Sequence, residues 1–462
     1  MSITASRFGS APLLLDWSGI PTEISPDRKA ALHAHFERMR TKLHDQVSGF
    51  YNSVSDPTLS QIEASERLAS SFLNLSTPAG PTLRHCVFIG IGGSSLGPLF
   101  LIDALKHRAK SPMQFHFFEN PDPIDWSYRI SKLNPAETLV CVVTKSGTTY
   151  ETLSIFMLAY DWLSRALGKT VAARHCVAIT DPEKGELLEF ARRESIPTLS
   201  IAPSVGGRFS IFTPVGLFAG ALAGLNMREL LLGGKKVRDY CEKATAEKNN
   251  FLTWAEALHS RAKSHGIHVM MPYTTPLRLL ANWWVQLWAE SLGKDGKGFT
   301  AVPALGAIDQ HSMLQLLRDG PNDKVIWFIN VSDFKTQVKI PSIDFKVKTF
   351  DLLEGQDLGD LLTTEFRAIQ RVMTNQKRPH LQLQIEELNE EALGAVFFTL
   401  SVLTAYMGEV MGVNPFDQPG VEEGKVYIRE KLEQNKRERA SGSERRNESG
   451  AEEVHRLRLH RE

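Results

Sequence analysis

Two short apolar segments each lead through a loop of glycines and hydroxyl residues into a helix-like segment. Residues 139–143 are mostly β-branched and precede T-K-S-G-T-T-Y-E-T, while residues 85–90 lead into I-G-G-S-S-L-G-P. Such runs are typical of buried strands, and a third is expected at residues 176–180. Strands that alternate with helices predict a parallel sheet covered on both faces. Both loops would then lie at its carboxyl edge, where open α/β sheets bind ligands.

A second series of strand-like and helix-like segments follows a helical connector at about residues 233–259. We expect strands at 267–271 and 325–330, and long helices opening at Pro276 and at about residues 355 and 389. The fold class is therefore α/β, with two mostly parallel sheets flanked by helices. The expected parts are an N-terminal helical segment at 1–57, a first domain at 58–232, a second domain at 233–432, and a charged, disordered or partly helical tail at 433–462.

Composition narrows the class of protein. The 462-residue chain is 42% hydrophobic and has a formal net charge of zero, which argues against a nucleic-acid or anionic-membrane surface. Four widely spaced cysteines form neither a disulfide framework nor a metal pattern, and they fit a reducing cytosol. The N-terminal apolar stretch is too short for a secretory signal, and residues 392–408 read as a buried helix. We therefore expect a cytoplasmic protein without membrane or nucleic-acid partners.

The loop at residues 144–152 is suited to hold an anion. Unpaired N–H groups at a helix start, together with the helix dipole, favour negative charge there. Ser146, Thr148 and Thr149 add hydroxyl donors, and Gly147 allows the backbone to come close. A phosphate cradle is one interpretation, and an ordinary helix capped by serine or threonine is the other.

The loop at residues 90–98 resembles several known sequence motifs, most of them only in part. A dinucleotide fingerprint requires glycine where Ser95 stands, and a P-loop requires lysine where Pro98 stands. The G-x-S-x-G of a hydrolase nucleophile elbow does match around Ser95, so a serine hydrolase stays an alternative. Two hydroxyl-rich loops at one sheet edge instead favour a single polar ligand, such as a sugar phosphate.

Later segments carry candidate chemical groups, each of which could also be structural. Arg208 follows two glycines, and Gly207 would let a ligand approach while the permanently charged guanidinium stabilises an oxyanion. Glu290 follows three tryptophans, and a poorly solvated carboxylate suits a general base. His311 lies in a polar turn and can pass protons near neutral pH, whereas an Asp-x-His pair with Asp309 lacks the further ligands of a metal site.

Five motifs join these segments in the order of a known family. They are IGIGGSSLGP, TKSGTTYET, VGGRFSIFTPVG, AESLGKDGKG with AIDQHS, and NPFDQPGVEEGK. Over about residues 13–431 the sequence resembles the bacterial phosphoglucose isomerases. The resemblance implies two sugar-isomerase (SIS) α/β domains. It also implies an aldose–ketose isomerase that interconverts glucose 6-phosphate and fructose 6-phosphate through a cis-enediol, in glycolysis and gluconeogenesis.

The resemblance also implies roles for single residues. Glu290 matches the base that moves a proton between C1 and C2, and Arg208 matches the group that stabilises the enediolate. His311 matches a group that helps to open the sugar ring. Lys425 is also implicated in ring opening. The positions matched to substrate contacts are Ser94, Thr144, Lys145, Ser146, Thr149, Gln418 and Lys425. Thr144 stands where many relatives have serine, which keeps the hydroxyl.

The family implies a homodimer whose active sites take residues from both subunits, and its mechanism requires no metal and no cofactor. A sugar-phosphate sensor built on the same domain would need the hydroxyl loops but not Glu290, His311 and Lys425. The joint presence of those three residues therefore favours the enzyme. The serine-hydrolase alternative differs because it predicts a reactive Ser95.

Overall fold

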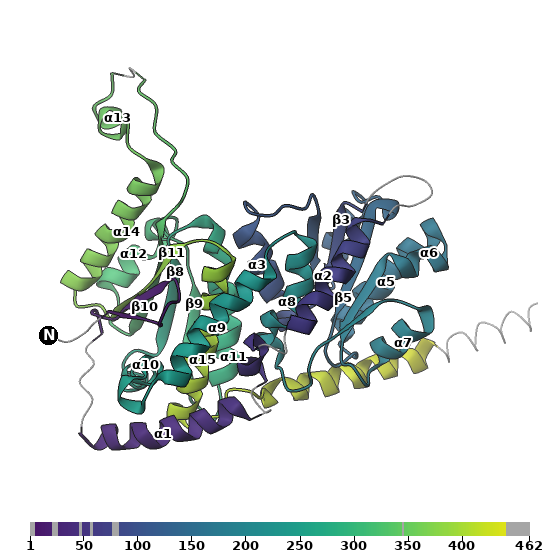
Figure 1. Ribbon diagram of the computed structural model, residues 1–462, viewed down its shortest axis with the longest axis horizontal. Coiled ribbons are helices and arrows are strands. Elements are labelled where there is room, and N and C mark those ends of the chain that lie inside the picture. The colour runs from purple at the N-terminus through teal and green to yellow at the C-terminus, as the bar shows by residue number, and fades with distance from the viewer. Residues whose placement is uncertain are drawn as a thin grey trace, which may run out of the picture. The chain divides into compact units, whose positions relative to one another are not determined.

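A computed structural model describes residues 5–20, 26–45, 49–55, 59–75, 83–343 and 346–439 of the chain. The chain divides into two compact units, Met1–Phe416 and Asp417–Glu462. The first unit contains two sheets with helices packed around them (Figure 1). The predicted α/β class is confirmed, whereas the predicted domain boundaries stay a prediction.

The first sheet has five parallel strands in the order β4-β3-β5-β6-β7. They are β3 (His85–Ile89), β4 (Gln114–Phe118), β5 (Thr138–Val143), β6 (Cys176–Thr180) and β7 (Thr198–Ser200). All residues of β5 and β6 are buried, as expected for strands covered on both faces. Cys141 packs in one cluster with α2 (Leu59–Leu73) and α8 (Pro214–Leu222), while its neighbour Val142 packs with α5 (Tyr150–Leu167).

The second sheet has six strands in the order β1-β2-β11-β10-β8-β9. Its parallel strands are β8 (Ile267–Pro272), β9 (Thr300–Pro303), β10 (Lys324–Asp333) and β11 (His380–Glu387). An antiparallel hairpin of β1 (Ala5–Arg7) and β2 (Leu13–Asp16) extends this sheet, with Leu15 opposite Leu383. The N-terminal segment, predicted to be helical, thus also supplies two strands. Leu13 and Leu15 lie two residues apart on β2, so both side chains point to the same face of the sheet, where they are buried.

Helices fill the rest of the first unit. After the hairpin come α1 (Pro26–His44) and the 3-10 turn η1 (Phe50–Val54), which supply the helices of the predicted N-terminal helical segment. The other α-helices are α3 (Leu96–Leu105), α4 (Pro123–Ile130), α6 (Lys169–Arg174), α7 (Glu186–Glu194), α9 (Met227–Lys243), α10 (Asn250–His259), α11 (Arg278–Leu292), α12 (Gln310–Asp319), α13 (Lys348–Leu353), α14 (Leu358–Asn375) and α15 (Glu390–Met411).

α15 is buried along nearly its whole length. α9 crosses it so closely that a Cβ added at Gly394 would lie 1.9 Å from the carbonyl oxygen of Leu230. By length and composition α15 could cross a membrane, but 94% of its most apolar stretch is buried inside the protein. The predicted buried helix at residues 392–408 is therefore confirmed.

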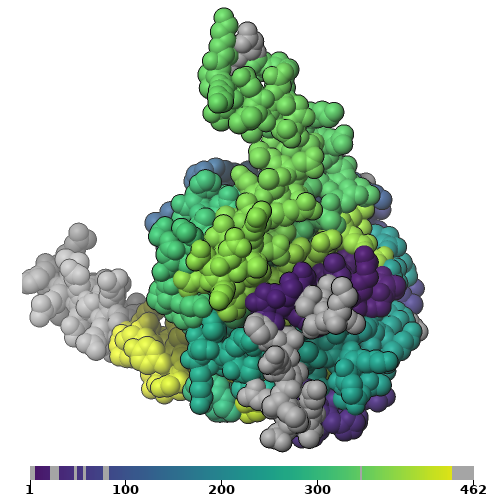
Figure 2. All heavy atoms as spheres, turned by 90° about the vertical axis from the view of Figure 1, so that its left-hand side faces the viewer, coloured from purple at the N-terminus to yellow at the C-terminus, as the bar shows by residue number. Residues whose placement is uncertain are grey.

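Between β10 and α14 the chain forms an extended arm, residues 334–343 and 346–357, that carries α13 (Figure 1). Figure 2 shows the arm, in green, projecting upward beyond the rest of the unit. Its exposed apolar side chains include those of Val338, Val347, Phe350 and Leu352. The arm therefore offers apolar surface that its own fold leaves uncovered.

The second compact unit begins with the 3-10 turn η8 (Pro419–Val421), and residues 422–439 are helical. The predicted charged tail at 433–462 starts within this helix. Its residues 440–462 lie outside the described residues, so that part of the prediction has no counterpart in the structure.

Candidate active site

Three loops meet at the carboxyl edge of the first sheet. The Ser94 loop (residues 90–95) follows β3, the hydroxyl loop (residues 144–149) follows β5, and the Arg208 loop (residues 201–208) follows β7. A Cβ added at Gly93 would lie 2.2 Å from the carbonyl carbon of Gly207, so the Ser94 and Arg208 loops touch through their backbones. Ser210 reinforces this contact by donating a hydrogen bond to the Gly93 carbonyl oxygen at 3.1 Å.

The hydroxyl loop gathers three side-chain oxygens at the start of α5. Thr144 Oγ1 lies 2.9 Å from Thr149 Oγ1, and Ser146 Oγ lies 3.5 and 3.4 Å from these two atoms. Thr149 occupies the N-cap position of α5, yet its side chain makes no capping hydrogen bond. Gly147 has a φ of 68°, a conformation that glycine adopts readily. The arrangement favours the anion cradle over the ordinary capped helix, because the hydroxyls bond to one another and leave the helix start open.

Lys145 joins the hydroxyl loop to the Arg208 loop. Its Nζ donates hydrogen bonds to the carbonyl oxygens of Pro203 at 2.5 Å and Val205 at 2.9 Å. Burial lowers the pKa of Lys145, and the nearby carboxylate of Asp181 partly offsets this effect. The ammonium thus holds together the hydroxyl loop and the Arg208 loop, which the resemblance to the family assigns to one substrate.

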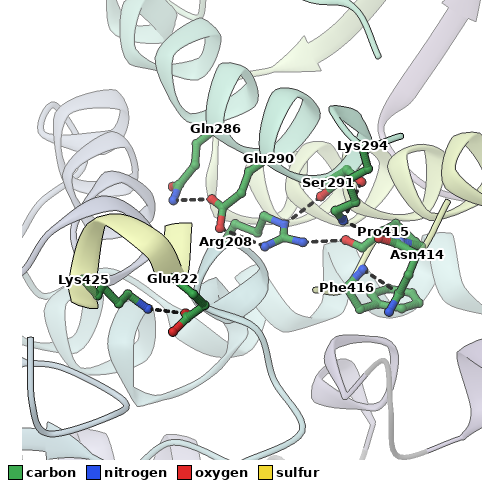
Figure 3. Close-up of polar contacts among 10 residues, drawn as sticks. All are labelled: Arg208, Gln286, Glu290, Ser291, Lys294, Asn414, Pro415, Phe416, Glu422 and Lys425. Atoms are coloured by element: carbon green, nitrogen blue, oxygen red, sulfur yellow. Dashed lines mark hydrogen bonds and ion pairs between the residues drawn. The ribbon is translucent and has the colours of Figure 1, made fainter. Parts of the chain in front are cut away.

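The guanidinium of Arg208 is buried and contacts three acceptors (Figure 3). Its Nε donates to Ser291 Oγ at 2.7 Å, and one terminal nitrogen donates to the carbonyl oxygen of Pro415 at 2.6 Å. The other terminal nitrogen donates to Glu290 Oε1 at 3.0 Å. The Arg208 side chain is 1% exposed and that of Glu290 is 25% exposed, so the carboxylate is the accessible member of the pair.

Gln286 holds the second oxygen of the same carboxylate. It lies one turn before Glu290 on α11 and donates to Glu290 Oε2 at 2.9 Å. A Cβ added at Gly92 would lie 2.9 Å from the Gln286 amide nitrogen, so α11 packs against the Ser94 loop at this point. Glu290 is therefore oriented from both sides and lies next to a loop at the edge of the first sheet.

Ser95 does not have the geometry of a hydrolase nucleophile. Its side chain is fully buried, and its hydroxyl donates to Glu119 Oε1 at 2.5 Å and to the Gly92 carbonyl oxygen at 3.3 Å. Within the described ranges, no histidine is hydrogen-bonded to Ser95. A nucleophile elbow presents its serine to the substrate beside a base, so this arrangement disfavours the serine-hydrolase alternative.

His311 lies in the first turn of α12 with an exposed side chain. Asp309 accepts hydrogen bonds from the Leu305 N–H at 2.7 Å and the Ser312 hydroxyl at 2.8 Å, so its carboxylate closes the turn. Among the residues that the structure describes, no group of three or more His, Cys, Asp or Glu side chains is placed to hold a metal ion.

Gln418 and Lys425 belong to the second compact unit. Gln418 directly precedes η8, and Lys425 Nζ donates to Glu422 Oε1 at 2.7 Å within the helical segment (Figure 3). Both residues lie on a short polar stretch, and their predicted contacts with a sugar stay predictions.

Comparison with known proteins places the chain in a family. The model of the phosphoglucose isomerase family matches residues 62–449. The chain belongs to the phosphoglucose isomerase family. Glucose-6-phosphate isomerase from Rubrobacter xylanophilus is 43% identical over 346 residues, which cover 73% of this chain and 80% of that one. Glucose-6-phosphate isomerase from Carboxydothermus hydrogenoformans is 37% identical over 360 residues, or 74% and 77% of the two chains.

Solved structures share the fold of this chain. A crystal structure of a hypothetical protein from Thermus thermophilus has a TM-score of 0.82 at 34% identity and covers 91% of this chain and 99% of that one. Glucose-6-phosphate isomerase from Chlamydia trachomatis shares the fold, with a TM-score of 0.74 at 19% identity over 93% and 89% of the chains. The predicted family, sugar-isomerase fold and enzyme class are confirmed.

Three residues that the structure places in this phosphoglucose isomerase site were not predicted. Gln286 could have been found, because it stands four residues before Glu290 and so shares its helix face. Ser291, the residue after Glu290, accepts a hydrogen bond from Arg208 with its hydroxyl oxygen. Pro415 accepts one from Arg208 with its backbone carbonyl oxygen. Backbone acceptors are common to all residues and leave no signal in a sequence.

Proposed function

We propose that this chain interconverts glucose 6-phosphate and fructose 6-phosphate, with Glu290 and Arg208 at the reacting carbons. Membership of the phosphoglucose isomerase family and the names of two relatives support the activity. The observation that carries the assignment is the buried Arg208 guanidinium held against the accessible Glu290 carboxylate. A base and a fixed cation in contact are what proton removal next to a carbonyl requires.

The reaction begins from the open-chain aldose. Glu290 removes the proton from C2, a C1–C2 double bond forms, and the carbonyl oxygen at C1 takes the negative charge. Protonation of that oxygen gives the cis-enediol. Loss of the O2 proton and return of a proton from Glu290 to C1 give the ketose. General base catalysis contributes roughly 100- to 10,000-fold, and Arg208, as a donor fixed towards the oxyanion, contributes roughly 100- to 1000-fold.

The substrate phosphate binds in the hydroxyl loop in this proposal. Thr144, Ser146 and Thr149 provide hydroxyl donors that already cluster within hydrogen-bond distance of one another. Ser94 adds a hydroxyl from the neighbouring loop, and Lys145 adds positive charge. The phosphate does not react, so its binding energy serves to place C1 and C2 against Glu290.

His311 and Lys425 act on the closed ring before proton transfer. His311 protonates the ring oxygen or accepts the C1 hydroxyl proton, and Lys425 assists in opening. Gln418 binds the sugar, and Gly207 lets it approach because it has no side chain. The support for these four roles is the resemblance of their sequence motifs to those of the family, and all four residues lie within residues 62–449, which the family model matches.

We further propose a cytoplasmic homodimer with shared active sites. In the described part of the chain, the exposed His311 imidazole makes no hydrogen bond or ion pair with Arg208 or Glu290, which suits a group that serves another subunit. The arm exposes apolar side chains of the kind that interfaces cover. All four cysteines are buried free thiols, in keeping with a reducing compartment.

Formation of glucose 6-phosphate from fructose 6-phosphate tests the function. The product is measured with a coupled dehydrogenase, without added metal. We expect steady product formation that depends on protein concentration. Absence of product from folded protein would overturn the proposal.

Mixing two inactive variants tests the shared site. In a dimer that combines Glu290→Gln with His311→Ala, one active site receives both intact side chains. After subunit exchange at equal concentrations, we expect recovery of about a quarter of the parent activity, since half of the dimers are mixed and each has one intact site. If exchange is demonstrated and no activity returns, the sites are not shared.

A further inference from the structure

Two lysines in the loop after α11 bind backbone carbonyls near the end of α15. Lys294 Nζ donates hydrogen bonds to the carbonyl oxygen of Ser291, at 3.0 Å, and to that of Asn414. Lys297 Nζ donates to the carbonyl oxygen of Met411 at 2.8 Å. Lys294 therefore ties the end of α11 to the segment that follows α15, and Lys297 ties the same loop to the last residue of α15.

The Lys294 contacts lie directly beside those of Arg208 (Figure 3). Ser291, whose carbonyl accepts from Lys294, also carries the hydroxyl that accepts from Arg208 Nε. Asn414 precedes Pro415, whose carbonyl accepts from an Arg208 terminal nitrogen at 2.6 Å. Lys294 thus connects Ser291 with the segment of Pro415, and both of these residues accept hydrogen bonds from the guanidinium.

We propose that Lys294 is a positioning residue for the Arg208–Glu290 pair, an inference that rests on the proposed function. The Pro415 ring already packs against α15, where a Cβ added at Gly408 would lie 2.7 Å from the Pro415 Cβ. Lys294, from the loop after α11, holds the peptide between Asn414 and Pro415 through its hydrogen bond to the Asn414 carbonyl oxygen. Together these contacts aim the Pro415 carbonyl at Arg208.

Loss of the Lys294 ammonium releases the Asn414 carbonyl and lets the Pro415 carbonyl move. Arg208 is too buried to replace that acceptor freely with water. A misplacement of about 1 Å at a reacting group lowers the rate by up to about 100-fold. The hydroxyl loop follows β5 of the first sheet, whereas Lys294 binds carbonyls of Ser291 and Asn414, so we expect phosphate binding to be unaffected.

Lys294→Met tests the proposal against Lys297→Met as the matched control. Both variants remove an ammonium that binds a carbonyl, but Lys294 binds the peptide next to Pro415, whose carbonyl accepts from Arg208, whereas Lys297 binds Met411 at the end of α15. We expect kcat of Lys294→Met to fall about 10- to 100-fold, with KM and the affinity for inorganic phosphate within about twofold of the parent. Lys297→Met should keep the parent kcat.

A second readout is the affinity for a five-carbon aldonate phosphate, whose carboxylate resembles the charge of the enediolate. This affinity should fall in Lys294→Met in parallel with kcat, because the ligand engages the same guanidinium. Lys294→Arg can still donate to two carbonyls and should recover most of the lost kcat. A merely structural lysine would alter stability without separating kcat from phosphate affinity.

The inference fails if folded Lys294→Met keeps the parent kcat and aldonate affinity, or if Lys297→Met loses as much of either. Should Lys294→Met not fold, Lys294→Gln is measured under the same criteria. A parent protein that does not isomerise fructose 6-phosphate would refute the proposed function and this inference with it. An active parent with an unaffected Lys294 variant refutes this inference alone.

Discussion

Replacement of Arg208 by lysine keeps the positive charge but removes the planar guanidinium that binds α11 and the segment after α15 at the same time. The guanidinium spans Ser291 Oγ at 2.7 Å, Glu290 Oε1 at 3.0 Å and the Pro415 carbonyl oxygen at 2.6 Å. An ammonium is a point charge on a flexible stem and cannot reproduce this planar geometry. At least one of the three acceptors therefore loses its partner in Arg208→Lys.

The size of the effect follows from burial. A buried acceptor left without a donor lowers the free energy of unfolding by about 1–3 kcal/mol. Loss of one preorganised donor to the oxyanion lowers kcat by about 100- to 1000-fold, which is roughly 3–4 kcal/mol in the barrier. KM should change little, because the hydroxyl loop, in which we propose that the phosphate binds, lies on another element.

Steady-state kinetics on fructose 6-phosphate and a thermal melt measure both effects. Arg278→Lys is the matched control, because Arg278 lies on α11, the helix of Glu290, but is 51% exposed and pairs with Asp103 at the surface. We expect the control to keep the parent kcat and melting temperature. A folded Arg208→Lys with kcat within about threefold of the parent would refute the assignment of a preorganised oxyanion donor. A variant that changed KM alone would show that Arg208 serves binding.

Three further predictions concern other parts of the chain. Thr149→Val removes one donor of the cradle and should raise KM about 10- to 100-fold with little change in kcat; an unchanged KM would mean that the loop holds something else. Burial and the nearby His265 lower the pKa of His268 to about 3, so stability is complete above the ordinary histidine value of about 6.5 and is lost as pH falls towards 3. Between pH 7 and pH 5 this loss is about 2 kcal/mol, and His268→Phe should lose correspondingly less melting temperature than the parent; equal losses would exclude His268. Burial alone would raise the pKa of Glu409, but hydrogen bonds from Lys42, Arg38 and His35 outweigh it and leave the pKa below its usual value. Its stabilisation is therefore present at neutral pH and lost in acid, so Glu409→Gln should lower the free energy of unfolding by about 2 kcal/mol at pH 7 and less below pH 4; a pH-independent difference would contradict this.

The buried strands of the first sheet could be predicted because each is a continuous apolar run with its own flanking loop. β6 has the predicted bounds, 176–180, and β5 begins one residue earlier than the apolar run at 139. Strand β4 was missed because it lies at the edge of the sheet, where only Phe118 of its residues is buried. β2 was missed because its partner, β11, lies some 370 residues later, and no local pattern reports such pairing.

The site divides in a similar way. The surroundings of Arg208 and Glu290 marked both residues only as candidates, the resemblance to the family assigned their roles, and the structure brings the two side chains into contact. The role of Lys145 as a tie between loops was not foreseen, because its acceptors are the carbonyls of Pro203 and Val205. Hydrogen bonds from side chains to backbone carbonyls depend on how loops pack, and such bonds cannot be predicted from the sequence motifs alone.

The central claim is that Glu290 moves the proton between C1 and C2, and isotope exchange in Glu290→Gln tests it most directly. The parent and the variant are incubated with fructose 6-phosphate in D₂O, and deuterium at C2 of glucose 6-phosphate and at C1 of fructose 6-phosphate is followed by NMR. We expect the parent to isomerise the sugar and to introduce deuterium at both carbons. Glu290→Gln should bind fructose 6-phosphate with nearly parent affinity but neither isomerise nor exchange it. Near-parent turnover or exchange in the folded variant would contradict the account.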